Sequence, residues 1–136
     1  MNLEEKKYLL LDLDGVCYGK HNNYSLEKVF GQVSRRMTKF ISERLNIDTI
    51  AAKELQTSYF YKYNTSLNGL MIHHNIPPQE FLKYVHTIDL SFMKEDKIMR
   101  RELEQLDMEK FIFTNGSAEH AKNILTHLGV YELFGR

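Results

Sequence analysis

The sequence predicts an α/β fold with two short buried strands near opposite ends of the chain and a long helical segment between them. The strands are expected at residues 8–11 and 110–113, because each is a short apolar run that stops abruptly at polar residues. Such uninterrupted apolar runs are typical of strands that are covered on both faces in a parallel sheet. Residues 25–106 instead show apolar side chains at three- and four-residue spacing, which indicates amphipathic helices.

The helices can be placed from this spacing and from residues that start or stop helices. The apolar stripe of a first helix is expected to contain Val29, Phe30, Val33, Met37, Phe40, Ile41 and Leu45. Asp48 is the expected N-cap of a second helix, and a short third helix is expected around residues 67–71. Pro78 is well placed to start a fourth helix, and a last one is expected near residues 96–106.

Two aspartates follow the first predicted strand. Asp12 and Asp14 are separated by one residue and followed by Gly15, so both are expected at the carboxyl end of the strand, where open α/β sheets place their chemistry. Two close carboxylates repel each other unless a cation lies between them or one carries a proton. Mg²⁺ fits, because it binds one or two carboxylates and completes its shell with water and phosphate oxygens. An ordinary turn opened by two aspartates is the alternative.

A polar segment also follows the second predicted strand. Thr114 offers a hydroxyl group, and Gly116 allows backbone N–H groups to approach an anion closely. Ser117 is the expected N-cap of a helix over Ala118–Leu128, and the start of a helix favours a nearby phosphate. The alternative for this segment is an ordinary strand-to-helix turn with a capping serine.

The two segments together resemble a known family. Leu-Leu-Leu-Asp-Leu-Asp-Gly-Val at 9–16 and Phe-Ile-Phe-Thr-Asn-Gly at 111–116 are similar to the first two motifs of the haloacid dehalogenase (HAD) superfamily of phosphohydrolases. Further similarity to its pyrimidine 5′-nucleotidase branch lies in segments 59–63, 66–71, 78–86 and 120–130. The resemblance implies a partial Rossmann-like HAD core over residues 1–18 and 107–136, with a helical cap over 19–106 inserted after the first strand.

The resemblance also implies a role for each site residue. Asp12 would be the nucleophile that forms an aspartyl-phosphate and a Mg²⁺ ligand. Asp14 would be the general acid/base and would bind the metal through its backbone carbonyl. Thr114 would bind a phosphoryl oxygen, helped by backbone N–H groups near Gly15 and Asn115. The implied activity is Mg²⁺-dependent hydrolysis of phosphate monoesters, with pyrimidine nucleoside monophosphates as the candidate substrates.

Part of the family pattern has no counterpart here. The superfamily uses a lysine after its third strand and an acidic cluster after its fourth, and both would lie beyond Phe134. The chain therefore resembles the first part of a longer enzyme and is expected to be inactive or incomplete by itself. A non-catalytic HAD-like remnant or binding module is the alternative. A receiver-like signalling domain also phosphorylates an aspartate, but it would lack the long helical insert.

Two groups of aromatic residues in the insert have alternative interpretations. His73 and His74 are adjacent, so their side chains would point about 100° apart on a helix and would not easily share a metal ion. Ordinary surface and core positions are the favoured interpretation for both histidines. Tyr59, Tyr61 and Tyr63 could either stack on a base or pack within the helical core.

The charge balance, the apolar runs and the single cysteine indicate which partners and which cellular compartment to expect. Lys plus Arg equals Asp plus Glu at 18 each, and this neutral balance argues against a nucleic-acid partner. The sequence contains neither a membrane-length apolar run nor a signal-peptide core. Cys17 is the only cysteine and is expected to be a small buried side chain, so a reducing cytoplasm is the expected location. The expected partners are a small phosphorylated metabolite and a second copy of the chain, paired through an exposed strand edge.

Overall fold

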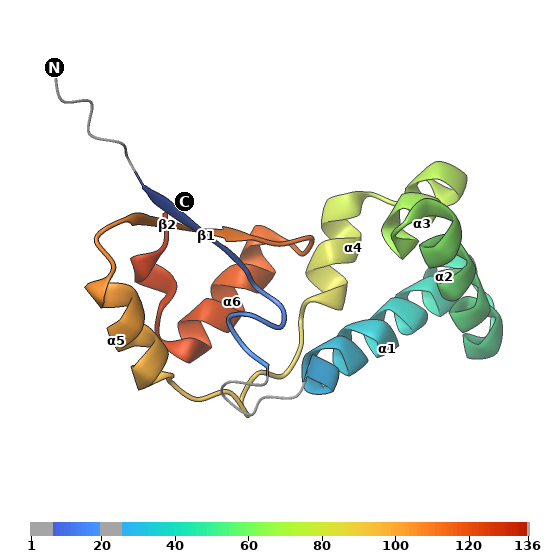
Figure 1. Cartoon of the computed structure of the whole chain (residues 1–136). Helices are drawn as coiled ribbons and strands as arrows, with labels where there is room; N and C mark the ends of the chain where they lie inside the picture. The colour runs from blue at the N-terminus through green and yellow to red at the C-terminus, as the bar shows by residue number, and fades with distance from the viewer. Residues whose placement is uncertain (1–6, 20–25, 136) are drawn as a thin grey trace, which may run out of the picture. The chain divides into compact units, whose positions relative to one another are not determined.

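The computed structural model describes residues 7–19 and 26–135 (Figure 1). Within these residues the chain is a mixed α/β structure, mostly helical, with six α-helices and a parallel sheet of two strands. The predicted α/β class is therefore confirmed. The chain divides into two compact units, unit 1 (Met1–Leu26 with Asp89–Arg136) and unit 2 (Glu27–Ile88). In the part of the chain that the structure describes, no helix is long and apolar enough to cross a membrane.

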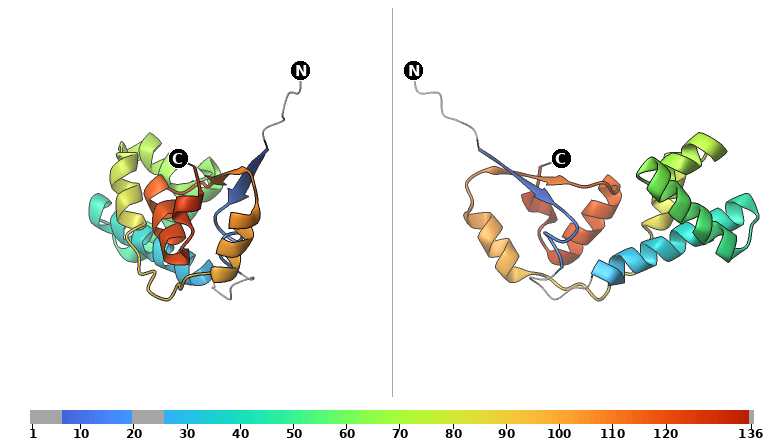
Figure 2. Two further views of the ribbon diagram at one scale, coloured as in Figure 1. Left: turned by 90° about the vertical axis from the view of Figure 1, so that its left-hand side faces the viewer. Right: turned by 45° about the vertical axis from the view of Figure 1, so that its right-hand side comes forward.

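The sheet belongs to unit 1. Its strands β1 (Tyr8–Asp12) and β2 (Glu109–Phe113) pair in parallel, in a register that sets Asp12 opposite Phe113. Leu13 continues the pairing, because its backbone N–H donates a hydrogen bond to the carbonyl oxygen of Phe113 (3.3 Å). Figure 2 shows the two strands side by side from two further directions. Both strands therefore end at the same edge of the sheet.

The strands are less buried than the sequence predicts. Leu9 and Leu11 are half-buried on one face of β1, whereas Tyr8 and Leu10 expose 56% and 67% of their surface on the other. Phe113, on the same outer face as Leu10, exposes 58%. The prediction of two buried strands is wrong because this sheet has only two strands in the described residues and is covered mainly on one face. An apolar run indicates that a strand is suited to burial. Whether the strand is buried depends on the elements that pack against it.

Two α-helices, α5 (Lys97–Gln105) and α6 (Ala118–Leu128), and a short 3₁₀-helix, η2 (Tyr131–Leu133), also belong to unit 1. The guanidinium group of Arg100 on α5 donates a hydrogen bond to the Gly129 carbonyl (2.5 Å) and also pairs with the Glu132 carboxylate on η2. The buried apolar residues of this unit include Leu13, Cys17, Tyr18, Leu90, Met93, Leu103, Ala121, Ile124, Leu125, Leu128 and Val130.

Unit 2 is helical. Its helices are α1 (Leu26–Leu45), α2 (Thr49–Tyr63), α3 (Ser66–His74) and α4 (Pro78–Val85). Its core contains Val33, Phe40, Ile41, Ala52, Leu70, Ile76, Phe81 and Val85. Phe40 and Phe81 meet edge to face, with ring centroids 5.2 Å apart. Because α5 lies in unit 1, unit 2 is shorter than the interval 19–106 that the sequence analysis assigns to the helical cap.

The predicted helix ends are confirmed where capping residues specify them. Asp48 caps α2, accepting a hydrogen bond from a backbone N–H of its first turn (2.8 Å). Ser117 caps α6 in the same way (3.1 Å), and Pro78 is the first residue of α4. Asn64 ends α2 in the left-handed conformation with a φ of 71°. Each of these signals acts through contacts within a few residues, so the sequence is sufficient to place them.

Candidate functional site

The carboxyl ends of β1 and β2 bring the two predicted motifs together. Asp12 is the last residue of β1 and lies opposite Phe113, the last residue of β2. Thr114 follows Phe113 directly, and its hydroxyl oxygen accepts a hydrogen bond from the backbone N–H of Gly116 (3.0 Å). The acidic motif and the hydroxyl motif are about a hundred residues apart in the sequence. They lie together at the carboxyl ends of the two strands.

Asp14 lies in the tight loop that follows β1. Gly15 turns this loop with a φ of 81°, a conformation that residues with a side chain rarely adopt. The hydroxyl group of Tyr18 donates a hydrogen bond to one carboxylate oxygen of Asp14, and Tyr18 itself is fully buried. The orientation of the predicted acid/base is therefore set by a buried phenol. The role of Tyr18 was not predicted. The signal for it in the sequence is an aromatic residue with a hydroxyl group four positions after Asp14.

Burial also governs the other ionisable side chain of this loop. Cys17 is fully buried, and its thiol donates a hydrogen bond to the Asp12 carbonyl (3.4 Å). Burial, followed by the negative charges of Asp12 and Asp14, raises the pKa of the Cys17 thiol to about 12. Burial and the bond to Asp14 likewise raise the pKa of Tyr18 far above its ordinary value. Both groups stay protonated at neutral pH, and the prediction that Cys17 is a buried side chain is confirmed.

The donor set at the strand ends fits a hard cation with few protein ligands. Asp12 is exposed and Asp14 is half-buried, so a cation could reach their oxygens from solvent. Within residues 7–19 and 26–135, no three His, Cys, Asp or Glu side chains are grouped to hold a metal ion. Mg²⁺ suits two carboxylates, because water and phosphate oxygens supply the rest of its shell. Asp12 and Asp14 are therefore the residues at these strand ends that could hold a cation such as Mg²⁺.

The residues that follow β2 include groups that could bind an anion. The hydroxyl of Thr114 precedes a turn at Gly116 that leads into α6. Helix α6 begins directly after this turn, and the positive end of a helix dipole stabilises a nearby phosphate. Gly15 and Asn115, whose backbone N–H groups the resemblance assigns to phosphate binding, are both exposed. Two aspartates and a threonine hydroxyl that precedes a helix therefore lie at the carboxyl ends of two neighbouring strands.

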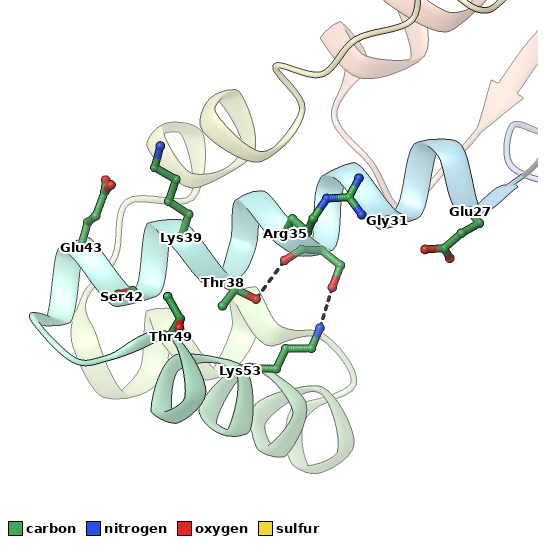
Figure 3. Close-up of a pocket in the computed structure, with 10 residues that line it drawn as sticks. Glu27, Gly31, Arg35, Thr38, Lys39, Ser42, Glu43, Thr49 and Lys53 are labelled. Atoms are coloured by element: carbon green, nitrogen blue, oxygen red, sulfur yellow. Dashed lines mark hydrogen bonds between the residues drawn. The ribbon is translucent and has the colours of Figure 1, made fainter.

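A second candidate is a polar groove between α1 and α2 in unit 2, which the sequence analysis did not predict. It has a volume of about 670 Å³ and is lined by Glu27, Gly31, Ser34, Arg35, Thr38, Lys39, Ser42, Glu43, Thr49 and Lys53 (Figure 3). Lys53 donates a hydrogen bond to the Ser34 hydroxyl (2.7 Å), and Thr38 donates one to the buried side chain of Gln56 (2.6 Å). These hydrogen bonds join α1 to α2. The polar residues of the groove therefore have a structural role in holding the two helices together.

The aromatic residues of α2 and α3 bind one another. The Nε2 atom of His74 lies 2.8 Å from the Tyr59 hydroxyl, and that of His73 lies 2.5 Å from the Tyr63 hydroxyl. Tyr59 also stacks on His73, with ring centroids 5.4 Å apart. The two histidines therefore lie within hydrogen-bond distance of different tyrosines. Tyr61, in contrast, exposes 79% of its surface.

The chain shows distant similarity to a curated protein. No family model matches the chain. It is 27% identical over 141 residues to "Phosphate metabolism protein 8" of Saccharomyces cerevisiae, an alignment that covers 95% of this chain and 42% of that protein. The chain thus spans less than half the length of this curated relative, and the similarity extends over nearly all of the chain.

Proposed function

We propose that the carboxyl edge of β1 and β2 is the phosphoryl-binding part of a Mg²⁺-dependent phosphate monoester hydrolase of the HAD type. The observation that carries this proposal is the parallel register of the two strands, which puts Asp12 and Thr114 at one edge of the sheet. A carboxylate and a phosphate-binding hydroxyl at one edge suit a mechanism with a phosphorylated aspartate. The distant similarity to a protein named for phosphate metabolism supports the proposal.

In the proposed reaction, a carboxylate oxygen of Asp12 attacks the phosphorus atom. The bond from phosphorus to the leaving oxygen breaks, which gives an aspartyl-phosphate and an alcohol. Asp14 gives a proton to the leaving oxygen and later takes one from the water that hydrolyses the intermediate. Tyr18 acts as a positioning residue, because its hydroxyl holds the Asp14 carboxyl group. Thr114 and the backbone N–H groups near Gly15 and Asn115 would bind the phosphoryl oxygens.

Asp12 and the backbone carbonyl of Asp14 would hold Mg²⁺, which would neutralise negative charge between nucleophile and phosphate. The partner of this site would then be a small phosphorylated metabolite. A cytoplasmic location belongs to the same proposal, since the single, buried Cys17 needs no oxidising compartment.

The proposed substrates are pyrimidine nucleoside monophosphates. This rests on the resemblance of segments 59–63 and 66–71 to the cap of the pyrimidine nucleotidase branch, and it assigns substrate selection to unit 2. Tyr59 and Tyr63 already bind the two histidines of α3, so Tyr61 is the tyrosine of this group that is exposed for stacking on a base. We expect uridine and cytidine monophosphates to bind more tightly than adenosine monophosphate.

A non-catalytic binding module is the second candidate. The donor set is compatible with it, because no third His, Cys, Asp or Glu side chain is grouped with Asp12 and Asp14 in the described residues. Such a module would bind phosphate and Mg²⁺ at the same edge without breaking a phosphate ester bond.

A Mg²⁺ titration followed by amide NMR tests the site. We expect the amide signals of residues 12–15 to shift with a Kd at or above roughly the millimolar range, because Asp12 and the Asp14 backbone carbonyl give an incomplete shell. Asp12→Asn should abolish these shifts. Asp48→Asn is the matched control, since it neutralises an aspartate that caps α2 in unit 2. Micromolar affinity, or no response at residues 12–15, would contradict the proposed site.

Turnover assays test whether this chain hydrolyses phosphate esters by itself. With p-nitrophenyl phosphate or uridine monophosphate, we expect no turnover above background, because loss of one charge-stabilising group typically costs about 10²–10³ in rate. Mg²⁺-dependent turnover that Asp12→Asn abolishes would establish a hydrolase and would show that another residue supplies the missing charge. Binding without turnover would agree with either an incomplete enzyme or a binding module.

A further inference from the structure

The sequence contains two Asn-Gly pairs, and the structure places them in different surroundings. Asn68 and Gly69 lie within α3, whereas Asn115 and Gly116 lie in the turn between β2 and α6. The backbone nitrogen that follows an asparagine can attack the side-chain amide of that asparagine, and glycine hinders the attack least because it has no Cβ. Whether the attack occurs depends on how firmly the local structure holds the two groups.

The pair in α3 is held at both residues. The Nδ2 atom of Asn68 donates a hydrogen bond to the Tyr63 carbonyl (3.0 Å), which fixes the side chain. Gly69 is buried, and a Cβ at this residue would lie 2.3 Å from Cγ of Tyr59. The hydrogen bonds of the helix also fix the backbone of both residues. Reaction at Asn68 would therefore require α3 to open.

The pair in the turn is held by a single contact. The backbone N–H of Gly116 donates a hydrogen bond to the Thr114 hydroxyl oxygen (3.0 Å). The side chain of Asn115 is exposed and forms no hydrogen bond with another residue that the structure describes. Rotation of the Thr114 side chain is sufficient to release the Gly116 nitrogen, and such rotations are much faster than the local unfolding of a helix.

We propose that Asn115 is a site of spontaneous deamidation and that the Thr114 hydroxyl limits its rate. The Gly116 backbone nitrogen loses its proton and bonds to Cγ of Asn115, the bond from Cγ to Nδ2 breaks, and ammonia leaves. The product is a cyclic succinimide. Water then adds to either carbonyl carbon of the ring and opens it, which gives an aspartyl or an isoaspartyl residue. No atom is oxidised or reduced, and solvent supplies the water.

Deamidation would place a negative charge in the turn that the proposed function assigns to phosphate binding. The neutral amide of Asn115 becomes a carboxylate, and the isoaspartyl form also lengthens the backbone. Because like charges repel, Asn115→Asp should raise the Kd for inorganic phosphate, measured with Mg²⁺ present, at least about tenfold. This consequence rests on the proposed phosphoryl site, whereas the deamidation itself does not.

Peptide mapping by mass spectrometry, after the 136-residue chain has aged at mildly alkaline pH, tests the site. Trypsin places Asn115 in peptide 111–122 and Asn68 in peptide 63–83, so one sample reports on both. We expect deamidation at Asn115 to be at least about tenfold faster, because reaction at Asn68 needs α3 to open. In concentrated urea neither pair is held, and the ratio of the two rates should fall toward one.

Substitutions test the role of the hydroxyl. Thr114→Val keeps the shape of the side chain and removes the acceptor, so it should speed deamidation about fivefold, the effect of one hydrogen bond. Thr126→Val is the matched control, because it removes a hydroxyl that donates to a carbonyl within α6 (2.6 Å), and it should leave the rate unchanged. Gly116→Ala adds a Cβ beside the attacking nitrogen and should slow the reaction severalfold. Alanine fits there, since φ of Gly116 lies outside the left-handed region.

The proposal is overturned if Asn68 deamidates as fast as Asn115 in the folded chain, or if Asn115 stays intact while both sites react in urea. An unchanged rate in Thr114→Val, with unchanged helical circular dichroism, would overturn the role of the hydroxyl. If Asn115 deamidates but the fresh chain shows no amide shifts at residues 114–117 with phosphate and Mg²⁺, the proposed phosphoryl site fails and the modification site stands.

Discussion

The helical core of unit 2 buries its apolar side chains, whereas the sheet of unit 1 leaves several of its apolar side chains exposed. In unit 2, Phe40 and Phe81 are buried and meet edge to face, and the helices around them supply the rest of the core. In unit 1, Tyr8 and Leu10 on β1 and Phe113 on β2 expose more than half of their surface. The difference indicates that unit 2 uses its apolar groups for its own stability, whereas the sheet leaves part of its apolar surface exposed in the described residues.

Polar groups show the same contrast. Gln56 is buried in unit 2 and exchanges hydrogen bonds with the side chains of Ser34 and Thr38. Asp12, at the carboxyl end of β1, is exposed to solvent. A buried amide with partners holds two helices together, whereas an exposed carboxylate at a strand end is available to a ligand. Substitutions in the core of unit 2 should therefore destabilise the protein more than substitutions at the exposed apolar side chains of the sheet.

The largest expected effect is the loss of a core ring from unit 2. Phe81→Ala should lower the free energy of unfolding by about 3–5 kcal/mol, because it removes a fully buried ring and leaves a cavity. Leu10→Ala, at a residue that exposes 67% of its surface, should change it by less than about 0.5 kcal/mol. Urea unfolding followed by NMR signals from each unit measures both values. Equal costs for the two substitutions would contradict the contrast between the units.

A smaller effect concerns the pH dependence of unit 1. Burial lowers the pKa of His120 on α6 to about 4, from an ordinary value of 6.5. Between these two pH values the unfolded chain binds a proton that the folded chain does not, so stability falls as the pH falls from 6.5 to 4. We expect a loss on the order of 2 kcal/mol in unit 1. His120→Leu should remove this loss, and His127→Gln, at an exposed residue of the same helix, should retain it.

The next effect concerns the loop that carries Asp14. Tyr18→Phe keeps the buried ring and removes only the hydroxyl that binds Asp14, so it should cost about 1–2 kcal/mol in unit 1. Tyr61→Phe removes the same atom from a residue that is 79% exposed, and it should cost nothing measurable. Thermal unfolding of the three proteins under one set of conditions compares them. If Tyr18→Phe were neutral, the phenol would not hold the carboxyl group.

The smallest effects are expected at helix caps, one in each unit. Ser117→Ala and Asp48→Ala should each cost about 1 kcal/mol, because each removes a side chain that accepts a hydrogen bond from the first turn of a helix. Hydrogen exchange should quicken in α6 for the first variant and in α2 for the second. Faster exchange throughout both units in either variant would show that the units do not unfold separately.

Local chemistry explains what the sequence could predict. The N-caps Asp48 and Ser117 and the helix start at Pro78 depend on contacts within a few residues, so their patterns were sufficient. The adjacency of Asp12 and Thr114 followed from two strands that were expected to lie in one parallel sheet.

Long-range packing explains what the sequence could not predict. Leu10 has the composition of a buried strand residue, but its exposure depends on whether another element covers that face. Helix α5 belongs to unit 1, and Arg100 on this helix pairs with Glu132, which lies 32 residues further along the chain. The hydrogen bond of Tyr18 to Asp14 depends on a loop conformation that Gly15 permits and that no periodic pattern indicates.

The most direct test of the proposed phosphoryl site is the binding of beryllofluoride, which bonds to a carboxylate oxygen and mimics a phosphoryl group. With Mg²⁺ present, we expect bound ¹⁹F NMR signals together with amide shifts at residues 114–117, and we expect Asp12→Asn to abolish both. Asp14→Asn should retain bound signals, because Asp14 is the proposed acid/base and not the phosphoryl acceptor. The absence of bound signals in the unsubstituted chain, or their persistence in Asp12→Asn, would contradict the assignment of Asp12 as the nucleophile.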